Sequence, residues 1–298
     1  MMEHLTCSTA KWLDKPDAAR LQAILVDKWV PYTLAQQVLQ FLAFLQVHPG
    51  TGRMPNLLLV GDTGNGKTHL LRHYLTRCRP TLLPAPATDG RVEQWPVLYV
   101  EAPAVPDEQR FYETILHALA VPITLGTRTR VRQQLVSDLL HDLGVRVLIV
   151  DEIQHMLAGT HTKQREVLNM LKLLANAVGI PLVFAGIRTA HHVILHDEQL
   201  NSRFERIELP HWVLNEEYLR LLDSLERLLP LRLPSRLAEP QLASKLLALS
   251  QGTIGGLVTL LKRLATHAIM TQQEHISLPQ VKHLEPIPSA CWLASKLE

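Results

Sequence analysis

The stretch Gly61-Asp62-Thr63-Gly64-Asn65-Gly66-Lys67-Thr68 is the strongest structural signal in the chain. It fills every fixed position of G-x-x-x-x-G-K-[ST], the pattern of a phosphate-binding P-loop. The run Asn56–Val60 before it, apolar from Leu57 onward, has the length of a buried strand, and the segment from His69 to Leu75 has the character of a helix. Because strand, glycine-rich loop and helix occur together, we predict a nucleotide site rather than an incidental glycine turn.

The residue types of this loop match the chemistry of a polyphosphate. Glycines let the backbone approach a polyanion closely, and successive N–H groups and the helix N-terminus attract negative charge. Lys67 is expected to bridge the β- and γ-phosphates of ATP, and the Thr68 hydroxyl to hold Mg²⁺. The residues expected to contact the nucleotide here are Gly61, Asp62, Thr63, Gly64, Asn65, Gly66, Lys67, Thr68 and His69.

The composition is that of a globular protein. Of its 298 residues, 47% are hydrophobic and 19% are charged. The net charge of +2 is compatible with a local basic surface but does not by itself indicate a nucleic-acid-binding protein. Three distant cysteines form no C-x-x-C pair, so neither a zinc site nor a disulfide framework is indicated. No leader pattern and no apolar run of about 18 residues is visible, so we expect a cytoplasmic protein with no membrane partner.

Strand and helix signals alternate through the first two thirds of the chain, which predicts an α/β fold with a parallel five-stranded sheet flanked by helices. The proline- and alanine-rich segment 79–94 is expected to be a loop. From Asn215 onward only helical patterns occur, which predicts a small all-helical lid. The expected division is a tail over 1–20, a nucleotide-binding domain over 21–212, the lid over 213–284 and a tail over 285–298.

A second chemical signal is the pair Asp151 and Glu152, which directly follows the apolar run Val147–Val150. Carboxyl ends of parallel strands share one edge of a sheet, so both carboxylates are expected beside the P-loop. Asp151 is then expected to support Mg²⁺, and Glu152 to polarise the attacking water as general base. An ordinary acidic turn after a buried strand is the structural alternative.

Arginines supply two further expectations. Arg203 and Arg206 precede the last predicted strand and suit an arginine finger that reaches a neighbour's γ-phosphate, with Arg203 favoured; a finger acting in trans implies an oligomer. A loop before a helix carries basic and hydroxyl side chains suited to DNA phosphates, although a solvated basic turn has the same composition. Its candidate residues are Thr127, Arg128, Arg130 and Arg132.

The adenine pocket is predicted from position alone. Val30 and Tyr32 lie in the segment before the first strand and are its candidates. A turn that packs on the core is an equally good interpretation of this segment.

Taken together, four runs resemble the TniB/TnsC branch of AAA+ ATPases, which are regulators of transposition. They are Gly-Asp-Thr-Gly-Asn-Gly-Lys-Thr, Ile-Val-Asp-Glu-Ile-Gln-His, Val-Phe-Ala-Gly-Ile-Arg-Thr-Ala and Ser-Arg-Phe-Glu-Arg-Ile-Glu-Leu-Pro-His-Trp. The resemblance implies ATP-dependent assembly into rings or filaments on double-stranded DNA. It also implies contact with a TniQ-type targeting protein and recruitment of a DDE transposase.

Two positions depart from the AAA+ pattern. Ile187 stands where a polar sensor is usual, so Arg188 or Thr189 substitutes or the sensor is missing. The lid has no arginine near the start of its third helix, so Ile254 and Gly255 are expected to meet the nucleotide through their backbone, and hydrolysis is expected to be slow.

Other functions remain open at this point. A helicase loader or replication initiator of the IstB or DnaC kind would carry the same P-loop. An adaptor that uses nucleotide only to change shape is disfavoured by Glu152, and a metabolic P-loop kinase by the arginine-and-lid ending.

Overall fold

The computed structural model describes residues 4–49, 54–84, 91–124 and 126–282. These residues form two compact units. The α/β unit runs from Thr33 to Pro210, and the helical unit combines the described residues before Thr33 with those after Pro210.

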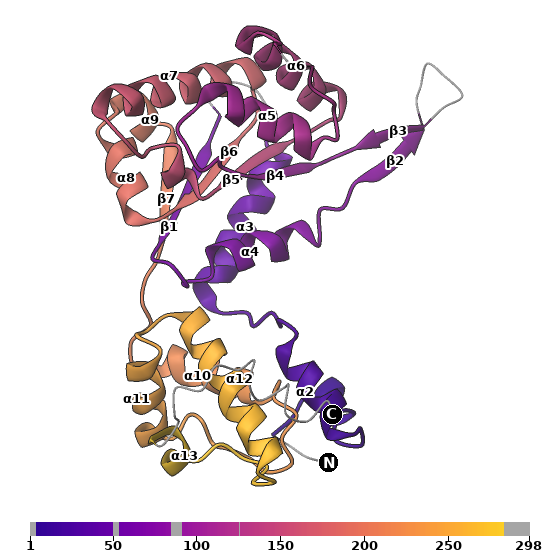
Figure 1. Ribbon diagram of the computed structural model, residues 1–298, viewed down its shortest axis with the longest axis vertical. Coiled ribbons are helices and arrows are strands. Elements are labelled where there is room, and N and C mark those ends of the chain that lie inside the picture. The colour runs from indigo at the N-terminus through magenta and orange to yellow at the C-terminus, as the bar shows by residue number, and fades with distance from the viewer. Residues whose placement is uncertain (1–3, 50–53, 85–90, 125, 283–298) are drawn as a thin grey trace. The chain divides into compact units, whose positions relative to one another are not determined.

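A five-stranded parallel sheet forms the centre of the α/β unit (Figure 1). Its strands are β1 (Asn56–Gly61), β4 (Val97–Glu101), β5 (Val147–Asp151), β6 (Leu182–Gly186) and β7 (Phe204–Leu209). Their order is β4-β5-β6-β1-β7, with every neighbouring pair parallel. The predicted sheet is therefore confirmed. Because the strands are parallel, the carboxyl ends of β1, β5 and β6 lie at one edge.

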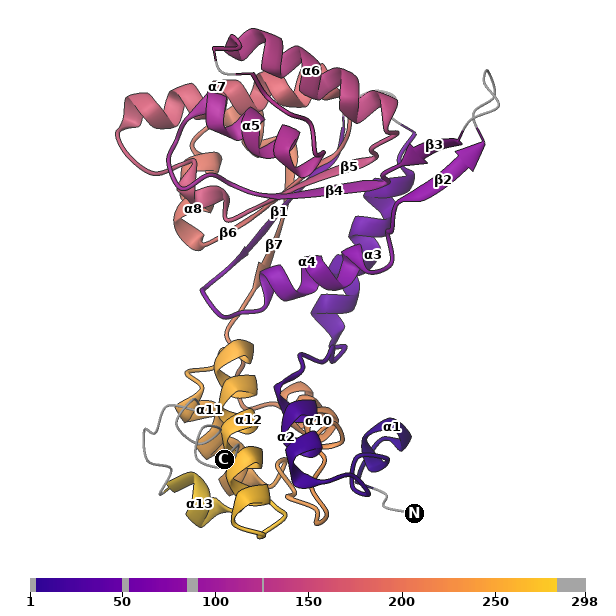
Figure 2. The same cartoon turned by 45° about the vertical axis from the view of Figure 1, so that its right-hand side comes forward.

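Helices cover both faces of this sheet. They are α3 (Thr33–Val47), α4 (Lys67–Leu75), α5 (Glu108–Ala118), α6 (Thr129–Asp142), α7 (His161–Val178), α8 (Arg188–Leu195) and α9 (Glu198–Asn201). Figures 1 and 2 show α3 and α4 on one face and α5, α6 and α7 on the other. Leu58 and Val60 belong to the core cluster beneath α5–α9, whereas Leu57 and Leu59, also buried, do not. Burial on both faces explains why β1 is apolar without interruption from Leu57 to Val60.

Residues 79–94 differ from the loop that the sequence predicts. β2 (Thr81–Pro84) and β3 (Arg91–Gln94) pair antiparallel as a separate two-stranded sheet, which projects from the α/β unit in Figure 1. The prolines of this segment favour loop in a sequence analysis, but proline is tolerated at the end of an edge strand.

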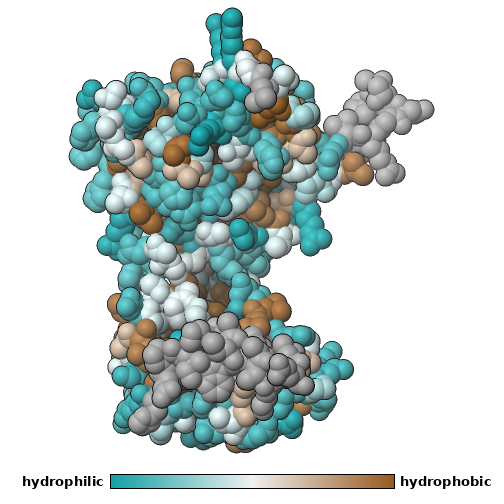
Figure 3. Space-filling view, viewed as in Figure 1, coloured by the Kyte–Doolittle hydropathy of each residue, from teal (hydrophilic) through white to brown (hydrophobic). Residues whose placement is uncertain are grey.

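The face of the protein seen in Figure 3 is mainly hydrophilic, with small hydrophobic patches. The exposed large apolar side chains of the α/β unit occur singly or in pairs on separate elements, such as Phe44 and Val47 on α3, Val131 and Leu135 on α6, and Leu173 on α7. Small numbers of exposed apolar residues of this kind are normal for a folded protein.

The helical unit is built from both ends of the chain. Its helices are α1 (Cys7–Ala10), α2 (Asp17–Leu25), α10 (Glu216–Glu226), α11 (Pro240–Leu249), α12 (Ile254–Met270) and α13 (Leu278–Lys282). Ile24 and Val30 share one core cluster with Leu222 and Leu264. Residues 21–32 were expected in the α/β domain, but in the structure they pack here. An apolar helix face shows that a helix is buried, not which core receives it.

Among the described residues no single helix is long and apolar enough to span a bilayer. The helices α11 and α12 pass that test only as a pair, bent by 114°.

A buried ion pair joins α2 to the loops of the helical unit. The side chain of Arg20 is fully buried, and its Nη1 donates to Glu274 Oε1 over 2.8 Å. Its Nε and Nη2 both donate to the carbonyl of Pro230, at 3.2 and 2.7 Å. Burial raises the pKa of Glu274, but the hydrogen bonds from Arg20 and from the Arg232 N–H outweigh it, so this pKa lies below its ordinary value.

Glu274→Ala is expected to destabilise the helical unit by about 3–5 kcal/mol, because it leaves the Arg20 guanidinium buried without its partner. Hydrogen exchange of α2 and of residues 230–276 measures this. The wild-type contribution is present above the ordinary pKa of a glutamate and is lost as the pH falls through the lowered folded value. Asp17→Ala is the control, since Asp17 also meets Arg20 but its side chain is 45% exposed. Equal effects of the two changes would contradict this account.

Candidate functional site

The P-loop connects the end of β1 to the start of α4. Gly64 and Gly66 have φ values of 82° and 84°, in the left-handed region that glycine adopts freely. A Cβ at Gly61 would lie 3.2 Å from both Cβ and the carbonyl oxygen of Leu209, so the loop passes close to the end of β7. The predicted strand, loop and helix are thus all in place, with amides of the turn and of the α4 N-terminus available to phosphate.

Lys67 is held inside this loop. Its side chain donates from Nζ to the carbonyl oxygens of Gly61 at 2.6 Å and Asp62 at 3.1 Å, and the residue is 5% exposed. Burial lowers its pKa, while the carboxylates of Glu152, Asp151 and Asp62 act in the opposite direction. A buried ammonium that donates its hydrogen bonds to carbonyl oxygens is well suited to an incoming phosphate, which would be a negatively charged acceptor in direct contact with it.

Asp151 is fully buried at the end of β5 and brings the two sequence signals together. Its Oδ2 accepts a hydrogen bond from Thr68 Oγ1 at 2.6 Å, and its Oδ1 accepts the backbone N–H of Glu152 at 2.8 Å. A hydroxyl and a carboxylate are hard oxygen donors of the kind that Mg²⁺ takes alongside phosphate and water. The residues present therefore fit a Mg²⁺–nucleotide group.

Tyr99 is a site residue that the sequence analysis missed. It lies on β4, the strand next to β5, and its hydroxyl donates to Asp151 Oδ2 at 3.0 Å. Burial, followed by the Asp151 carboxylate, raises the pKa of this phenol, so it stays a neutral donor. Only the register of β4 on β5 reveals it, because a tyrosine within an apolar strand has the pattern of a core residue.

Glu152 follows β5 in an unusual backbone conformation. Its φ of 55° lies in the left-handed region, where a residue with a Cβ is sterically strained. Residues strained in this way cluster at functional sites. Its Oε2 accepts a hydrogen bond from the amide of Gln154, in the short helix η1 (Ile153–His155). The Glu152 carboxylate therefore has a hydrogen-bonding partner in the side chain of Gln154.

Arg188 follows Ile187, the expected sensor position, and the structure brings its side chain near the P-loop residue Asp62. It is the first residue of α8, and its Nε lies 3.8 Å from Asp62 Oδ1. Its Nη2 lies 3.0 Å from Glu208 Oε1, on β7. Of the two substitutes for Ile187 that the sequence offers, Arg188 is the one with these contacts.

The two arginine-finger candidates lie on β7 and its approach. The backbone N–H of Asn56 donates to the carbonyl of Arg203, so Arg203 lies at the amino ends of β1 and β7. The P-loop follows the carboxyl end of β1, at the opposite edge of the sheet. Arg203 Nη1 donates to Asn176 Oδ1 at 2.8 Å, and Arg206 pairs with Glu208. The structure therefore does not bring Arg203 to the P-loop of its own chain.

The adenine and lid candidates belong to the helical unit. Val30 is 6% exposed and belongs to the core of this unit, as expected if its segment packs on a core. The Tyr32 ring packs edge-on against Trp212, with ring centroids 5.2 Å apart. Burial and then Glu217 raise the pKa of Tyr32 to about 12. Ile254 and Gly255 open α12, which Thr253 caps. Their nucleotide contacts remain predictions.

The basic loop divides into exposed and internal residues. Arg128 and Arg130, at the start of α6, are exposed. Arg132 is 2% exposed; its Nη2 meets Glu113 Oε1 at 3.0 Å and its Nη1 donates to the Thr127 carbonyl. The Thr127 hydroxyl donates to the Thr124 carbonyl at 2.8 Å. Arg132 thus anchors the loop to α5, and its expected contact with DNA stays a prediction.

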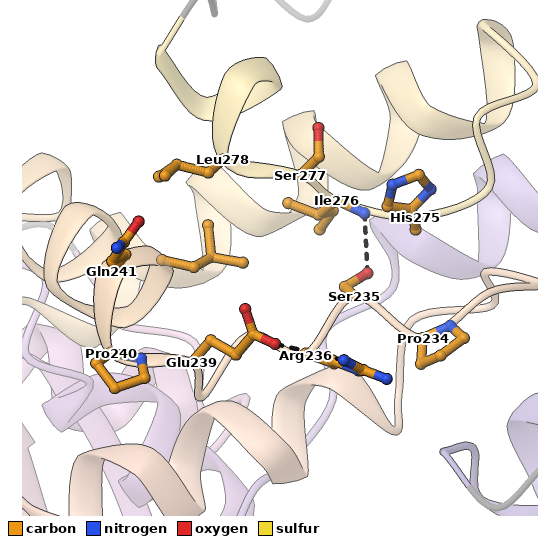
Figure 4. Close-up of a pocket in the computed structure, with 11 residues that line it drawn as sticks. Pro234, Ser235, Arg236, Glu239, Pro240, Gln241, His275, Ile276, Ser277 and Leu278 are labelled. Atoms are coloured by element: carbon orange, nitrogen blue, oxygen red, sulfur yellow. Dashed lines mark hydrogen bonds and ion pairs between the residues drawn. The ribbon is translucent and has the colours of Figure 1, made fainter.

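An open pocket lies elsewhere. It has a volume of about 680 Å³ and lies in the helical unit, between the start of α11 and the segment before α13 (Figure 4). Arg236 and Glu239 pair at its edge, and Ser235 Oγ accepts the backbone N–H of Ile276. None of the motif residues lines it, so it is not the nucleotide site.

The comparisons with known proteins agree with this geometry. Solved structures with the same fold include Cdc6p from Pyrobaculum aerophilum (TM-score 0.61, 19% identity, covering 86% of this chain and 68% of that one). The Aeropyrum pernix ORC1 protein, solved in complex with DNA, has a TM-score of 0.59 at 19% identity, over 88% and 67% of the two chains. AMPPCP-bound DnaA from Aquifex aeolicus has a TM-score of 0.51 at 14% identity, over 82% and 66%. Among curated proteins no match was found.

The fold and the nucleotide site define an AAA+ ATPase. A family model described as "Bacterial TniB protein" matches residues 20–214, which is more than half of the chain. The chain therefore belongs to the TniB family.

Proposed function

We propose that this protein is an ATP-dependent regulator of DNA transposition, which oligomerises on double-stranded target DNA and recruits a DDE transposase and a TniQ-type targeting protein. Membership of the TniB family is the observation that carries the proposal. The intact Thr68–Asp151–Glu152 arrangement supports it, because a regulator that is reset by hydrolysis needs a working ATPase site.

In the proposed reaction each residue of the site has one task. The P-loop amides and Lys67 would bind and orient the phosphates, and Thr68 and Asp151 would hold a Mg²⁺ ion, which neutralises phosphate charge when bound. Glu152 accepts the proton of the attacking water. Tyr99 keeps the Asp151 carboxylate in place by its hydrogen bond.

The proposed finger gives ATP hydrolysis a reason to require an oligomer. Arg203 lies at the edge of the sheet away from its own P-loop, so its guanidinium is proposed to complete a neighbour's site. Arg206, paired with Glu208 on the same strand, is the second candidate. Hydrolysis would then depend on assembly.

DNA contact is proposed for Arg128 and Arg130, supported by their exposure at the start of α6. Replacing both with alanine is expected to weaken binding to all duplex sequences alike. The slope of log K against log salt should become shallower by about 2, because each arginine that neutralises a phosphate contributes about 1. Fluorescence anisotropy across a salt series measures it.

Arg165→Ala is the matched control for that experiment, because Arg165 is an exposed arginine on α7 of the same unit. It should leave the slope unchanged. An unchanged slope in the Arg128/Arg130 double variant would remove these residues from the DNA surface.

The function as a whole is tested by mixing the protein with duplex DNA and ATP or a slowly hydrolysed analogue. Ordered nucleotide-dependent particles are expected by electron microscopy, and strand transfer by the cognate transposase should rise when they form. Absence of any nucleotide-dependent assembly on DNA would contradict the proposal.

A replication-initiator or helicase-loader function is the second candidate. It is favoured by the fold shared with the ORC1 and DnaA structures, one of which was solved with DNA. Stimulated loading of a replicative helicase, without any effect on strand transfer, would favour this alternative.

A further inference from the structure

Gln154 has a role that the proposed ATPase residues do not account for. Its side-chain amide is engaged at both ends: Nε2 donates to Glu152 Oε2, and Oε1 accepts the backbone N–H of Ile187 at 3.3 Å. Both bonds are satisfied by one orientation of the amide, with nitrogen toward the carboxylate and oxygen toward the N–H. The side chain therefore links Glu152 to the junction of β6 and α8.

Gly186 leaves the space that the Gln154 side chain occupies. A Cβ on Gly186 would lie 2.8 Å from Gln154 Oε1 and 2.9 Å from Ile153 Cγ2, both closer than real contacts allow. The φ of Gly186 is outside the left-handed region, so the backbone there would accept any residue. Glycine is therefore needed for space, and the space is filled by Gln154 and its neighbour.

The arrangement fixes the carboxylate of Glu152 relative to the sheet. The backbone of Glu152 is in the left-handed region, and its N–H is held by Asp151 Oδ1 at 2.8 Å. Three single bonds still separate its Cα from its carboxyl carbon, so backbone constraints alone leave the carboxylate free to rotate. The Gln154 amide removes that freedom by tying Oε2, through itself, to the rigid end of β6.

We propose that Gln154 is a positioning residue for ATP hydrolysis: in the space left by Gly186, its amide donates to the Glu152 carboxylate and accepts the Ile187 N–H, and so ties the carboxylate to the end of β6. The inference rests on the proposed role of Glu152 as general base. It gives a function to two residues of the family-like runs, the glutamine of Asp-Glu-Ile-Gln-His and the glycine of Ala-Gly-Ile-Arg, that phosphate binding leaves unexplained.

Gln154→Met tests the amide while keeping the length of the side chain. With the full-length protein on duplex DNA, kcat for ATP is expected to fall about 10- to 100-fold, the loss typical of a misplaced catalytic group. The KM for ATP, the affinity for a fluorescent ATP analogue and the melting temperature should stay near wild type, because no phosphate contact or core residue is removed. Gln164→Met is the control, since the Gln164 amide bonds to the Leu157 carbonyl and does not reach Glu152.

Gly186→Ala disturbs the same link from the other side and should lower kcat by a similar factor. In the double variant Gln154→Met/Gly186→Ala the loss should be no greater than in the worse single variant, because both act on one interaction. Multiplied losses would overturn the proposal, as would full activity of Gln154→Met. A fall in kcat that is matched by a fall in melting temperature would assign Gln154 a merely structural role and also overturn it.

Glu152→Gln separates this inference from the function on which it rests. If the wild type hydrolyses ATP and Glu152→Gln does so equally well, the role of Glu152 is wrong and Gln154 has nothing to position. If Glu152→Gln is inactive and Gln154→Met is fully active, only the inference about Gln154 fails.

Discussion

Glu152→Gln is expected to reduce kcat for ATP hydrolysis by about 10²- to 10⁴-fold, the usual contribution of a general base. The amide has nearly the shape of the carboxylate but cannot accept the proton of water. Nucleotide binding should persist, because the P-loop, Lys67 and the Thr68–Asp151 pair are untouched. Assemblies on DNA, which the wild type is expected to dismantle after hydrolysis, should therefore accumulate with ordinary ATP. Phosphate release and electron microscopy on the same samples measure both effects.

Lys67→Ala provides the contrast for this prediction. It removes a phosphate-binding group, so it should abolish assembly as well as hydrolysis. If Glu152→Gln also failed to bind nucleotide, Glu152 would be a structural residue and the assignment of the base would be wrong.

Arg203→Ala is expected to reduce DNA-stimulated ATPase activity by about 10³-fold or more, as for other arginine fingers. The residue lies away from its own P-loop, so its loss should damage only the neighbour's site. Mixing Arg203→Ala subunits with Glu152→Gln subunits is the decisive measurement, because Glu152→Gln is expected to keep nucleotide binding and assembly. The first keep the general base and the second keep the finger, so mixed assemblies should regain activity that neither variant has alone.

Arg165→Ala is again the matched control, since it removes an exposed arginine of the same unit without touching β7. Arg206→Ala distinguishes the two finger candidates. Failure of the mixture to recover any activity, with both variants shown to co-assemble, would rule out a finger in trans.

The centre of the site was predictable from the sequence because its geometry follows from topology. A P-loop after one parallel strand and an Asp-Glu pair after another must meet at the carboxyl edge of the sheet. The 2.6 Å hydrogen bond from Thr68 to Asp151 is the result, although the two residues are far apart in the chain. The glycine positions of the P-loop were equally readable, since Gly64 and Gly66 require positive φ.

What could not be predicted depends on partners that no local pattern encodes. From the sequence alone, Arg132 is indistinguishable from an arginine that binds phosphate. The structure shows that it forms an ion pair with Glu113 on α5. Tyr99 and Gln154 acquire their roles only through the register of β4 and the position of Ile187. The chemical type of a basic, aromatic or amide side chain limits which hydrogen bonds or ion pairs it can form, whereas the fold determines which of them it forms.

The two-part origin of the helical unit has a consequence for synthesis. Residues up to Tyr32 leave the ribosome first, yet the core that receives Ile24 is completed only by helices that begin at Glu216. The whole α/β unit, the 178 residues of Thr33–Pro210, is made in between. Until then the face of α2 that carries Arg20 has no Glu274 to meet. The nascent chain must therefore carry the apolar residues of this segment without their core through most of translation, which exposes the segment to misfolding and aggregation.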